Sequence, residues 1–217
     1  MGRSVMSSVE VKVRRFELGS GVFQERDDRI AADAAICIFV NGEFFRTLLA
    51  SPVMVEELVV GHLLGEGVIG SRDDLVSVGV APLRVDVVLG GEVDLGRLTM
   101  GKMDLITTAC GAAASPGELR GLGLPAAPVG GVVEAERVWL MARELNVRSG
   151  TYRETGGTHG AMLVPVAGRH LFFAEDVGRH IAGDGGVGAG VLGGLVLGGG
   201  GWGSAGRVAG GGGVRVA

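Results

Sequence analysis

The sequence contains only two cysteines, little net charge and no strongly hydrophobic run, and each of these absences excludes a class of protein. Cys37 and Cys110 cannot form a disulfide framework, and neither lies at metal-ligand spacing from a second cysteine or a histidine. A net charge of −4 provides no overall field that would attract nucleic acid or an acidic membrane surface. The first residues contain no apolar core of signal-peptide length. We therefore expect a cytoplasmic globular protein that holds no permanent metal and binds neither nucleic acid nor a membrane.

Glycine, in contrast, is abundant, with 42 glycines in 217 residues and 17 of them within residues 183–217. Residues 185–206 carry no charge, but twelve of these 22 residues are glycine, so the segment is a poor helix former and not a membrane span. Two explanations of this segment remain open. It is either natural sequence from a high-GC genome, as the two lysines among 20 basic residues also indicate, or a frameshifted reading that is not native.

The hydrophobic pattern predicts strands mixed with helices, and therefore a layered domain of mixed α/β class. Asn41-Gly42 lies between two apolar runs and predicts a tight hairpin turn within residues 34–50. After Ser51-Pro52, residues 53–69 predict an amphipathic helix. The remaining predicted elements are strands over residues 9–18, 75–80, 84–89, 161–166 and 170–174, and a helix over residues 132–146.

Three loops concentrate reactive or anion-binding groups. Cys110 lies in a small-residue loop just before a predicted helix start at Ser115-Pro116, a position that lowers the pKa of a thiol and favours the nucleophilic thiolate. In residues 155–160 (TGGTHG), glycines would let backbone N–H groups approach a phosphate. In residues 175–180 (EDVGRH), Arg179 could hold the same anion bidentately. These residues predict a thiol and anion site without naming its substrate.

Each of these residues also has a purely structural interpretation. Cys37 lies within an apolar run and is expected to be an inert core residue, while Cys110 is either functional or inert. A TGG sequence is common in turns, and EDVGRH is equally consistent with a cluster of salt bridges at a strand end. His62 and His170 are expected to be structural residues of a helix face and a strand.

Taken together, several motifs resemble the formate dehydrogenase accessory sulfurtransferase family, FdhD/NarQ. The matching residues cover about residues 34–184 in order and spacing. They are Val40-Asn41-Gly42, Ser51-Pro52 followed by residues 56–67 (EELVVGHLLGEG), Cys110-Gly111, Thr155-Gly156-Gly157 with His159, and residues 175–180 with Asp184.

The resemblance implies a cytidine deaminase-like layered α/β domain with a smaller N-terminal α+β subdomain, in a homodimer. Residues 1–100 would form the N-terminal β-rich part, residues 101–184 the sulfurtransferase and cofactor-binding core, and residues 185–217 a glycine-rich tail that completes or distorts the core. The implied activity is to accept sulfur as a persulfide from a cysteine desulfurase and to pass it to the molybdenum bis-guanine-dinucleotide cofactor of formate dehydrogenase.

In this interpretation Cys110 carries the sulfur, and the cofactor is bound as a client through its guanine nucleotide and phosphates. The residues that would bind it are Thr155, Gly156, Gly157, His159, Glu175, Asp176, Gly178, Arg179, His180 and Asp184.

The sequence departs from the family at three places. Ala113 stands where a second cysteine is often found, so a disulfide or sulfur relay between these two positions is not available; a one-cysteine mechanism is still open, and the sequence does not decide whether Cys110 alone suffices. The zinc signature of deaminases is absent, which argues against zinc and hydrolytic deamination. Gly185-Gly186 follow Asp184 where the family has lysine and a helix.

The alternatives to a sulfurtransferase are a non-catalytic molybdenum cofactor-binding chaperone and, less favoured, a nucleotide-metabolising enzyme of deaminase-like fold. Neither the formate dehydrogenase served nor the choice of molybdenum or tungsten follows from the sequence.

Overall fold

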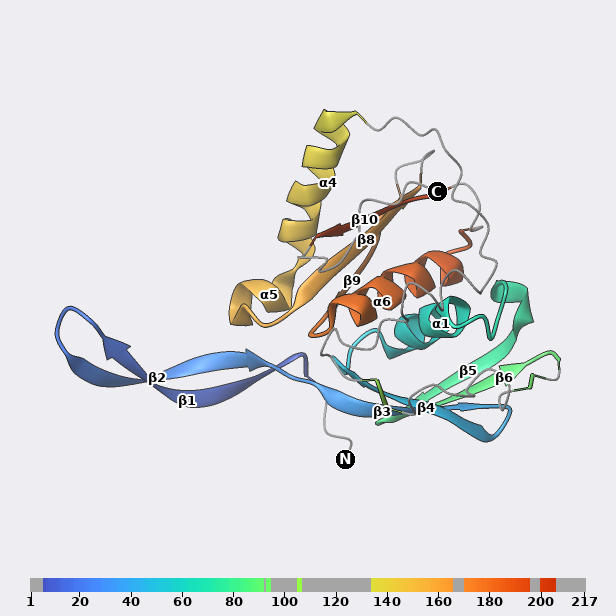
Figure 1. Cartoon of the computed structure of the whole chain (residues 1–217), viewed down its shortest axis with the longest axis horizontal. Helices are drawn as coiled ribbons and strands as arrows, with labels where there is room; N and C mark the ends of the chain where they lie inside the picture. The colour runs from blue at the N-terminus through green and yellow to red at the C-terminus, as the bar shows by residue number, and fades with distance from the viewer. Residues whose placement is uncertain are drawn as a thin grey trace, which may run out of the picture.

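The computed structural model describes residues 6–91, 93–94, 105–106, 134–165, 170–195 and 200–205, with residues 105–106 and 200–205 as backbone only. The architecture is mixed α/β, as predicted, and Figure 1 shows a body of two sheets and their helices from which a narrow two-stranded arm projects. The strand order in the larger sheet is β5-β6-β3-β4-β7, and in the smaller sheet β10-β8-β9.

The larger sheet follows the hydrophobic alternation of its strands. Its hairpin turns at Asn41 and Gly42, whose φ angles of 51° and 86° confirm the predicted tight turn. Alternate residues Ile36, Ile38 and Val40 are buried on the face that the helices cover. The strands are β3 (Ala34–Val40), β4 (Glu43–Ala50), β5 (Leu75–Ala81), β6 (Arg84–Leu89) and β7 (Leu105–Ile106), and a short 3-10 helix, η1 (Arg72–Asp74), precedes β5.

Helix α1 (Val55–Gly65) covers this sheet and α6 (Arg179–Leu192) packs on α1, and the sequence pattern described neither helix fully. Helix α1 forms where a helix was predicted, but residues 58–63 are all buried, so it is not amphipathic. The reason is that α1 lies between the sheet and α6. The glycine-rich segment was expected to be a poor helix former, but helix α6 runs through its first part. The boundary expected between the core, residues 101–184, and the glycine-rich tail, residues 185–217, therefore falls inside this helix.

Close packing of α1 and α6 explains why glycine is used at their crossing. A Cβ atom on Gly61 would overlap the carbonyl oxygen of Asp184, and one on Gly188 would overlap the carbonyl oxygen of Glu57. Burial of this interface therefore outweighs the low helix propensity of glycine, which is about 1 kcal/mol per residue relative to alanine. Among the described helices, none is long and apolar enough to cross a membrane.

The smaller sheet carries the loops of interest. Its predicted strands are confirmed within two residues as β8 (His159–Pro165) and β9 (Phe172–Asp176), and β10 (Gly200–Ala205) joins β8 at its other edge. Leu145 of α4 (Ala135–Arg148) packs against Met162 and Val164 of β8. The start of the segment expected as a loop is instead helical, forming α5 (Gly150–Thr155).

The arm consists of two paired strands, of which the sequence predicted only the first. Strand β1 (Ser8–Glu17) pairs with β2 (Val22–Ala31) in an antiparallel register without a bulge. Strand β2 was missed because its residues are mostly polar and almost entirely exposed. In Figure 1 the arm extends away from both sheets.

Candidate functional site

The register of the smaller sheet brings two of the three predicted loops together. Strands β8 and β9 are antiparallel neighbours, with His159 opposite Asp176 and Gly160 opposite Glu175. The TGGTHG segment leads into β8 and the EDVGRH segment leaves β9, so both meet at the same end of the sheet. Helix α6 (Arg179–Leu192) begins at this end of the sheet, three residues after Asp176.

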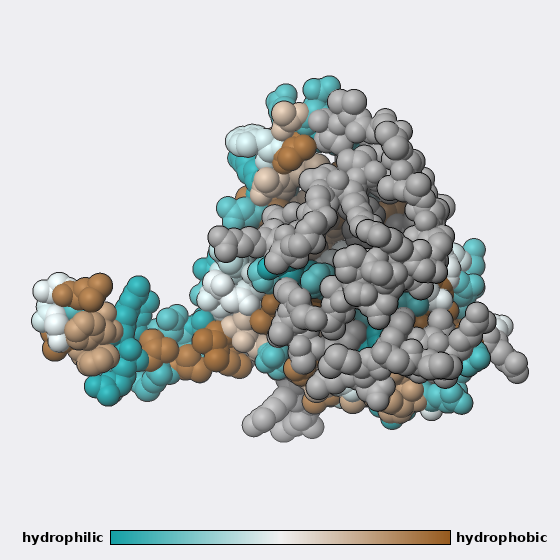
Figure 2. Space-filling view, viewed as in Figure 1, coloured by the Kyte–Doolittle hydropathy of each residue, from teal (hydrophilic) through white to brown (hydrophobic). Residues whose placement is uncertain are grey.

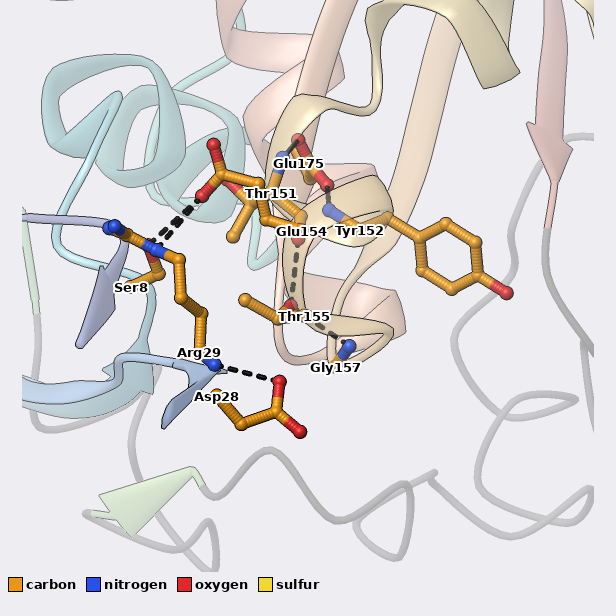
Figure 3. A network of polar contacts seen from close by, with 9 residues as sticks. All are labelled: Ser8, Asp28, Arg29, Thr151, Tyr152, Glu154, Thr155, Gly157 and Glu175. Carbon is orange, nitrogen blue, oxygen red and sulfur yellow. Dashed lines mark hydrogen bonds and ion pairs between the residues drawn. The ribbon is translucent and has the colours of Figure 1, made fainter. Parts of the chain in front are cut away.

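Glu175 fixes the shape of the TGGTHG turn. Its carboxylate accepts hydrogen bonds from the N–H groups of Thr151 and Tyr152, at 3.2 and 2.5 Å (Figure 3). It also accepts one from the buried hydroxyl of Thr158 at 2.6 Å. The turn itself begins where α5 ends at Gly156, whose φ of 66° is in the left-handed region that favours glycine. Glu175 is thus satisfied by the chain and acts on the site by positioning this turn.

The base of the arm is attached to the same turn. Arg29 of β2 forms an ion pair with Glu154 at 3.3 Å and donates to the hydroxyl of Ser8 at 2.8 Å. Thr155 donates its hydroxyl to the Thr151 carbonyl and accepts from the Gly157 N–H. Figure 3 shows these contacts as one network between the two arm strands and α5.

Asp176 joins the two sheets. Its carboxylate, 4% exposed, accepts from the Ser51 N–H and the Gly178 N–H, both at 2.7 Å, while the Ser51 hydroxyl accepts from the Val177 N–H at 3.2 Å. Burial raises the pKa of Asp176 to about 7, although these backbone donors oppose the rise. Ser51 of the Ser51-Pro52 motif therefore joins the end of β4 to the start of α6 by hydrogen bonds.

Arg179 and His159 are the site residues with the capacity to bind a ligand. The Nε atom of Arg179 is buried and has no hydrogen-bond partner among the described residues. Burial, with a smaller contribution from the charge of Arg179, lowers the pKa of His159, so its imidazole tends to be neutral. A cavity of about 660 Å³ adjoins the turn, and its described lining includes His159, Gly157, Tyr152 and Asn146. The ring of Tyr152 and the amide of Asn146 suit a nucleotide base, and Arg179, which is not among the residues that line this cavity, suits a phosphate.

The structure places the other predicted residues elsewhere. Asp184 bonds to His62 of α1 at 2.9 Å, and His62 in turn lies 3.4 Å from the buried Arg46 of β4, so Asp184 joins helices and does not reach the turn. His62 is buried. His180 is exposed to solvent. Cys110 and Gly111 lie outside the described residues.

Cys37 also differs from expectation. It is half-buried on the face of the larger sheet opposite the core residues Ile36 and Ile38, with its Sγ 3.6 Å from the Thr47 hydroxyl. In the part of the chain that the structure describes, no group of three or more His, Cys, Asp or Glu side chains is arranged to hold a metal ion.

Sequence reasoning missed Ser51 as a partner of the site, and Tyr152 and Asn146 as cavity residues. Ser51 and Asp176 are 125 residues apart, and only the matching Ser51-Pro52 motif signalled that this position matters. Tyr152 is the only tyrosine of the chain and lies three residues before the TGG sequence. This closeness is a weak sequence signal that Tyr152 belongs to the site.

Comparison with known proteins agrees with the resemblance seen in the motifs. The "Sulfur carrier protein FdhD" of Methanothermobacter thermautotrophicus is 31% identical over 77% of this chain and 64% of its own length. The protein of the same name from Bacillus licheniformis is 28% identical over 84% of this chain and 68% of its own. The chain thus spans about two thirds of the length of these relatives.

A solved structure supports the fold. The crystal structure of a candidate formate dehydrogenase accessory protein from Desulfotalea psychrophila superposes with a TM-score of 0.63 at 23% identity, over 87% of this chain and 68% of the other. A sequence model of the FdhD/NarQ family matches residues 31–210, which include every motif named above. The chain belongs to the FdhD/NarQ family.

Proposed function

We propose that the protein is a sulfur carrier that accepts a persulfide sulfur on Cys110 and delivers it to a guanine-nucleotide-containing molybdenum cofactor during formate dehydrogenase maturation. The observation that carries the proposal is the meeting of the TGGTHG and EDVGRH segments at one end of the smaller sheet, where the Nε of Arg179 has no hydrogen-bond partner among the described residues and a cavity adjoins the TGGTHG segment. The names of the two relatives support the sulfur-carrying part. The cytoplasmic homodimer and the deaminase-like layering belong to the same proposal.

The described residues would hold the cofactor as substrate. Arg179 would donate to a diphosphate oxygen, which would supply the partner that its Nε lacks. The Gly156 and Gly157 N–H groups of the TGG turn already donate within the chain, so the turn would contribute through its shape, which Glu175 fixes. Tyr152 and Asn146 line the cavity, where a ring can stack on guanine and an amide can pair with its edge.

The sulfur chemistry requires one thiol from this chain and one from outside it. The Cys110 thiolate attacks the outer sulfur of the desulfurase persulfide, so that a new S–S bond forms while the donor's own cysteine leaves as a thiolate. Release of that sulfur as sulfide to the metal consumes two electrons. Because Ala113 replaces a second cysteine, a small-molecule thiol must supply them by forming a mixed disulfide with Cys110.

Transfer of labelled sulfur tests the carrier role. The protein is incubated with a cysteine desulfurase and sulfur-labelled cysteine, and the label is localised by mass spectrometry of peptides. We expect the label on Cys110 in wild type and in Cys37→Ser, and none in Cys110→Ser. An unlabelled wild type, or equal labelling of Cys110→Ser, refutes the carrier role.

Nucleotide binding tests the anion site separately. Titration calorimetry with guanosine diphosphate should show about tenfold or greater loss of affinity in Arg179→Gln, since a charge-assisted bond to phosphate is lost. Arg148→Gln is the matched control, because Arg148 is an exposed residue of α4 that pairs with Glu144. Equal affinity in wild type and Arg179→Gln would show that the anion site is wrong.

A further inference from the structure

The arm formed by β1 and β2 is a separate two-stranded sheet. Among the described residues, its polar contacts with the body lie near its base, where Arg29 and Ser8 meet Glu154. An isolated two-stranded ribbon is marginally stable in water. Several of its apolar side chains are nonetheless exposed, with Val9 at 40%, Ile30 at 48% and Phe23 at 57%. Figure 2 shows apolar surface interrupted by hydrophilic surface along the arm.

The outer edge of β1 is the surface available for pairing. Ala32 donates its N–H to the carbonyl of Ser7, so odd-numbered residues of β1 direct their backbone groups toward β2. The even-numbered residues, such as Glu10 and Lys12, therefore direct N–H and C=O groups away from β2. No described strand pairs with that edge. Open strand edges of this kind are templates for pairing with another chain.

The side chains along this edge of β1 are complementary in charge to those of a second, antiparallel copy of β1. If two copies of β1 pair antiparallel about Val11, Glu10 of each copy lies opposite Lys12 of the other. Within each arm, Glu10 lies opposite Arg29 and Lys12 lies opposite Asp27. One row across the four strands of the two arms therefore has strictly alternating charge: Arg29 and Glu10 of one copy, then Lys12 and Asp27 of the second copy. On the other face Val9 lies opposite Val13 and Val11 opposite Val11, so that six valines form a continuous strip.

Neighbouring registers lack this match. A two-fold axis at Lys12 places two lysines opposite each other, and one at Val13 places Lys12 opposite Arg14 of the other copy, which is destabilising. The Val11 register also satisfies the backbone, because Glu10 and Lys12 are the residues whose N–H and C=O groups face outward. With five basic and five acidic side chains within residues 8–31, the arm has no net charge to attract a polyanion or a polycation.

We propose that the arm is a dimerisation element, in which β1 pairs antiparallel with β1 of a second copy of this chain about Val11 and forms a four-stranded sheet. The overlap covers about residues 8–14, so each tip, with Phe16 and Phe23, extends past the base of the other arm toward the other body. The proposal does not depend on sulfur transfer, and most of the arm precedes the residues 31–210 that the family model matches.

Charge reversal at the paired positions tests the interface. In sedimentation experiments the wild type is expected to be a dimer, and Lys12→Glu and Glu10→Lys should each raise the dissociation constant about tenfold or more, because each creates like charges in both symmetric pairs. Mixing the two variants restores opposite charges in a heterodimer and should restore association. Arg148→Glu, on the exposed face of α4, is the matched control and should not change it.

A disulfide trap tests the register. In this pairing the two Val11 residues form a non-hydrogen-bonded pair, whose Cα atoms lie about 4.5 Å apart, so Val11→Cys should cross-link two copies on mild oxidation. Val13→Cys lies opposite Val9 and should cross-link no more than wild type. Circular dichroism confirms that each variant is folded. A monomeric wild type, a dimer insensitive to both charge reversals, or equal cross-linking of the two cysteine variants would overturn the proposal.

Discussion

A single buried carboxyl group, Asp176, should make the stability of this protein fall as pH rises. Most aspartates with backbone hydrogen bonds behave in the opposite way, because such bonds favour the charged form. For Asp176, burial outweighs the three backbone donors and raises its pKa from 3.8 to about 7. The folded protein therefore binds a proton at this site under conditions in which the unfolded chain has released it.

The magnitude follows from the difference between the two pKa values. Each unit is worth about 1.4 kcal/mol, so a rise of about three units corresponds to about 4 kcal/mol in total. The contribution is fully present below the unfolded pKa of 3.8 and is lost as pH rises toward the folded pKa of about 7. Between pH 5 and pH 8, about 2 to 3 kcal/mol of it should disappear.

Urea unfolding of wild type and Asp176→Asn at several pH values between 5 and 8 measures this loss. The asparagine variant cannot titrate, so subtracting its free energy of unfolding removes the pH dependence of all other groups. The wild type should lose its advantage over the variant, by about 2 to 3 kcal/mol, as pH rises. A difference that is constant with pH, or that grows, would refute the assignment of a raised pKa to Asp176.

Three further changes test the packing and the site. Gly188→Ala should lower the free energy of unfolding by about 1 to 3 kcal/mol, because its Cβ meets the Glu57 carbonyl. The control Gly183→Ala has open space and should be neutral or stabilising; equal effects in urea unfolding would contradict the close crossing. Thr158→Val should cost about 1 to 3 kcal/mol through the lost bond to Glu175, and an unchanged unfolding midpoint would exclude that bond as a support of the turn. Because the pKa of His159 is lowered, wild type should lose thermal stability relative to His159→Gln as pH falls below 6.5; parallel melting curves would argue against it.

Much of the fold could be predicted because it follows local rules. The hairpin at Asn41, strands β3 to β6 of the larger sheet and helix α4 each carry a regular hydrophobic period or a turn signal of their own. Strand β2 lacks such a period, since its side chains face solvent on both sides of a thin arm. Helix α6 is formed against its own propensity by burial between α1 and the smaller sheet, which no local pattern describes.

The site could be predicted only in part, for the same reason. Residues within TGGTHG and EDVGRH were expected to act together, and β8 and β9 do bring these segments to one place. Asp184 follows EDVGRH closely in sequence, but the turn of α6 directs it to His62. The hydrogen bond between Ser51 and Asp176 joins distant parts of the chain. A single sequence carries no pattern that indicates such a contact.

The proposed function requires the joint action of Cys110 and the proposed anion site at Arg179. The decisive measurement is the rate at which labelled sulfur passes from the loaded protein to the molybdenum bis-guanine-dinucleotide cofactor in the presence of a small-molecule thiol. Arg179→Gln should load as much label as wild type and transfer it at least about tenfold more slowly, and Cys110→Ser should transfer none. Transfer by Arg179→Gln at the wild-type rate, or any transfer by Cys110→Ser, would contradict the account.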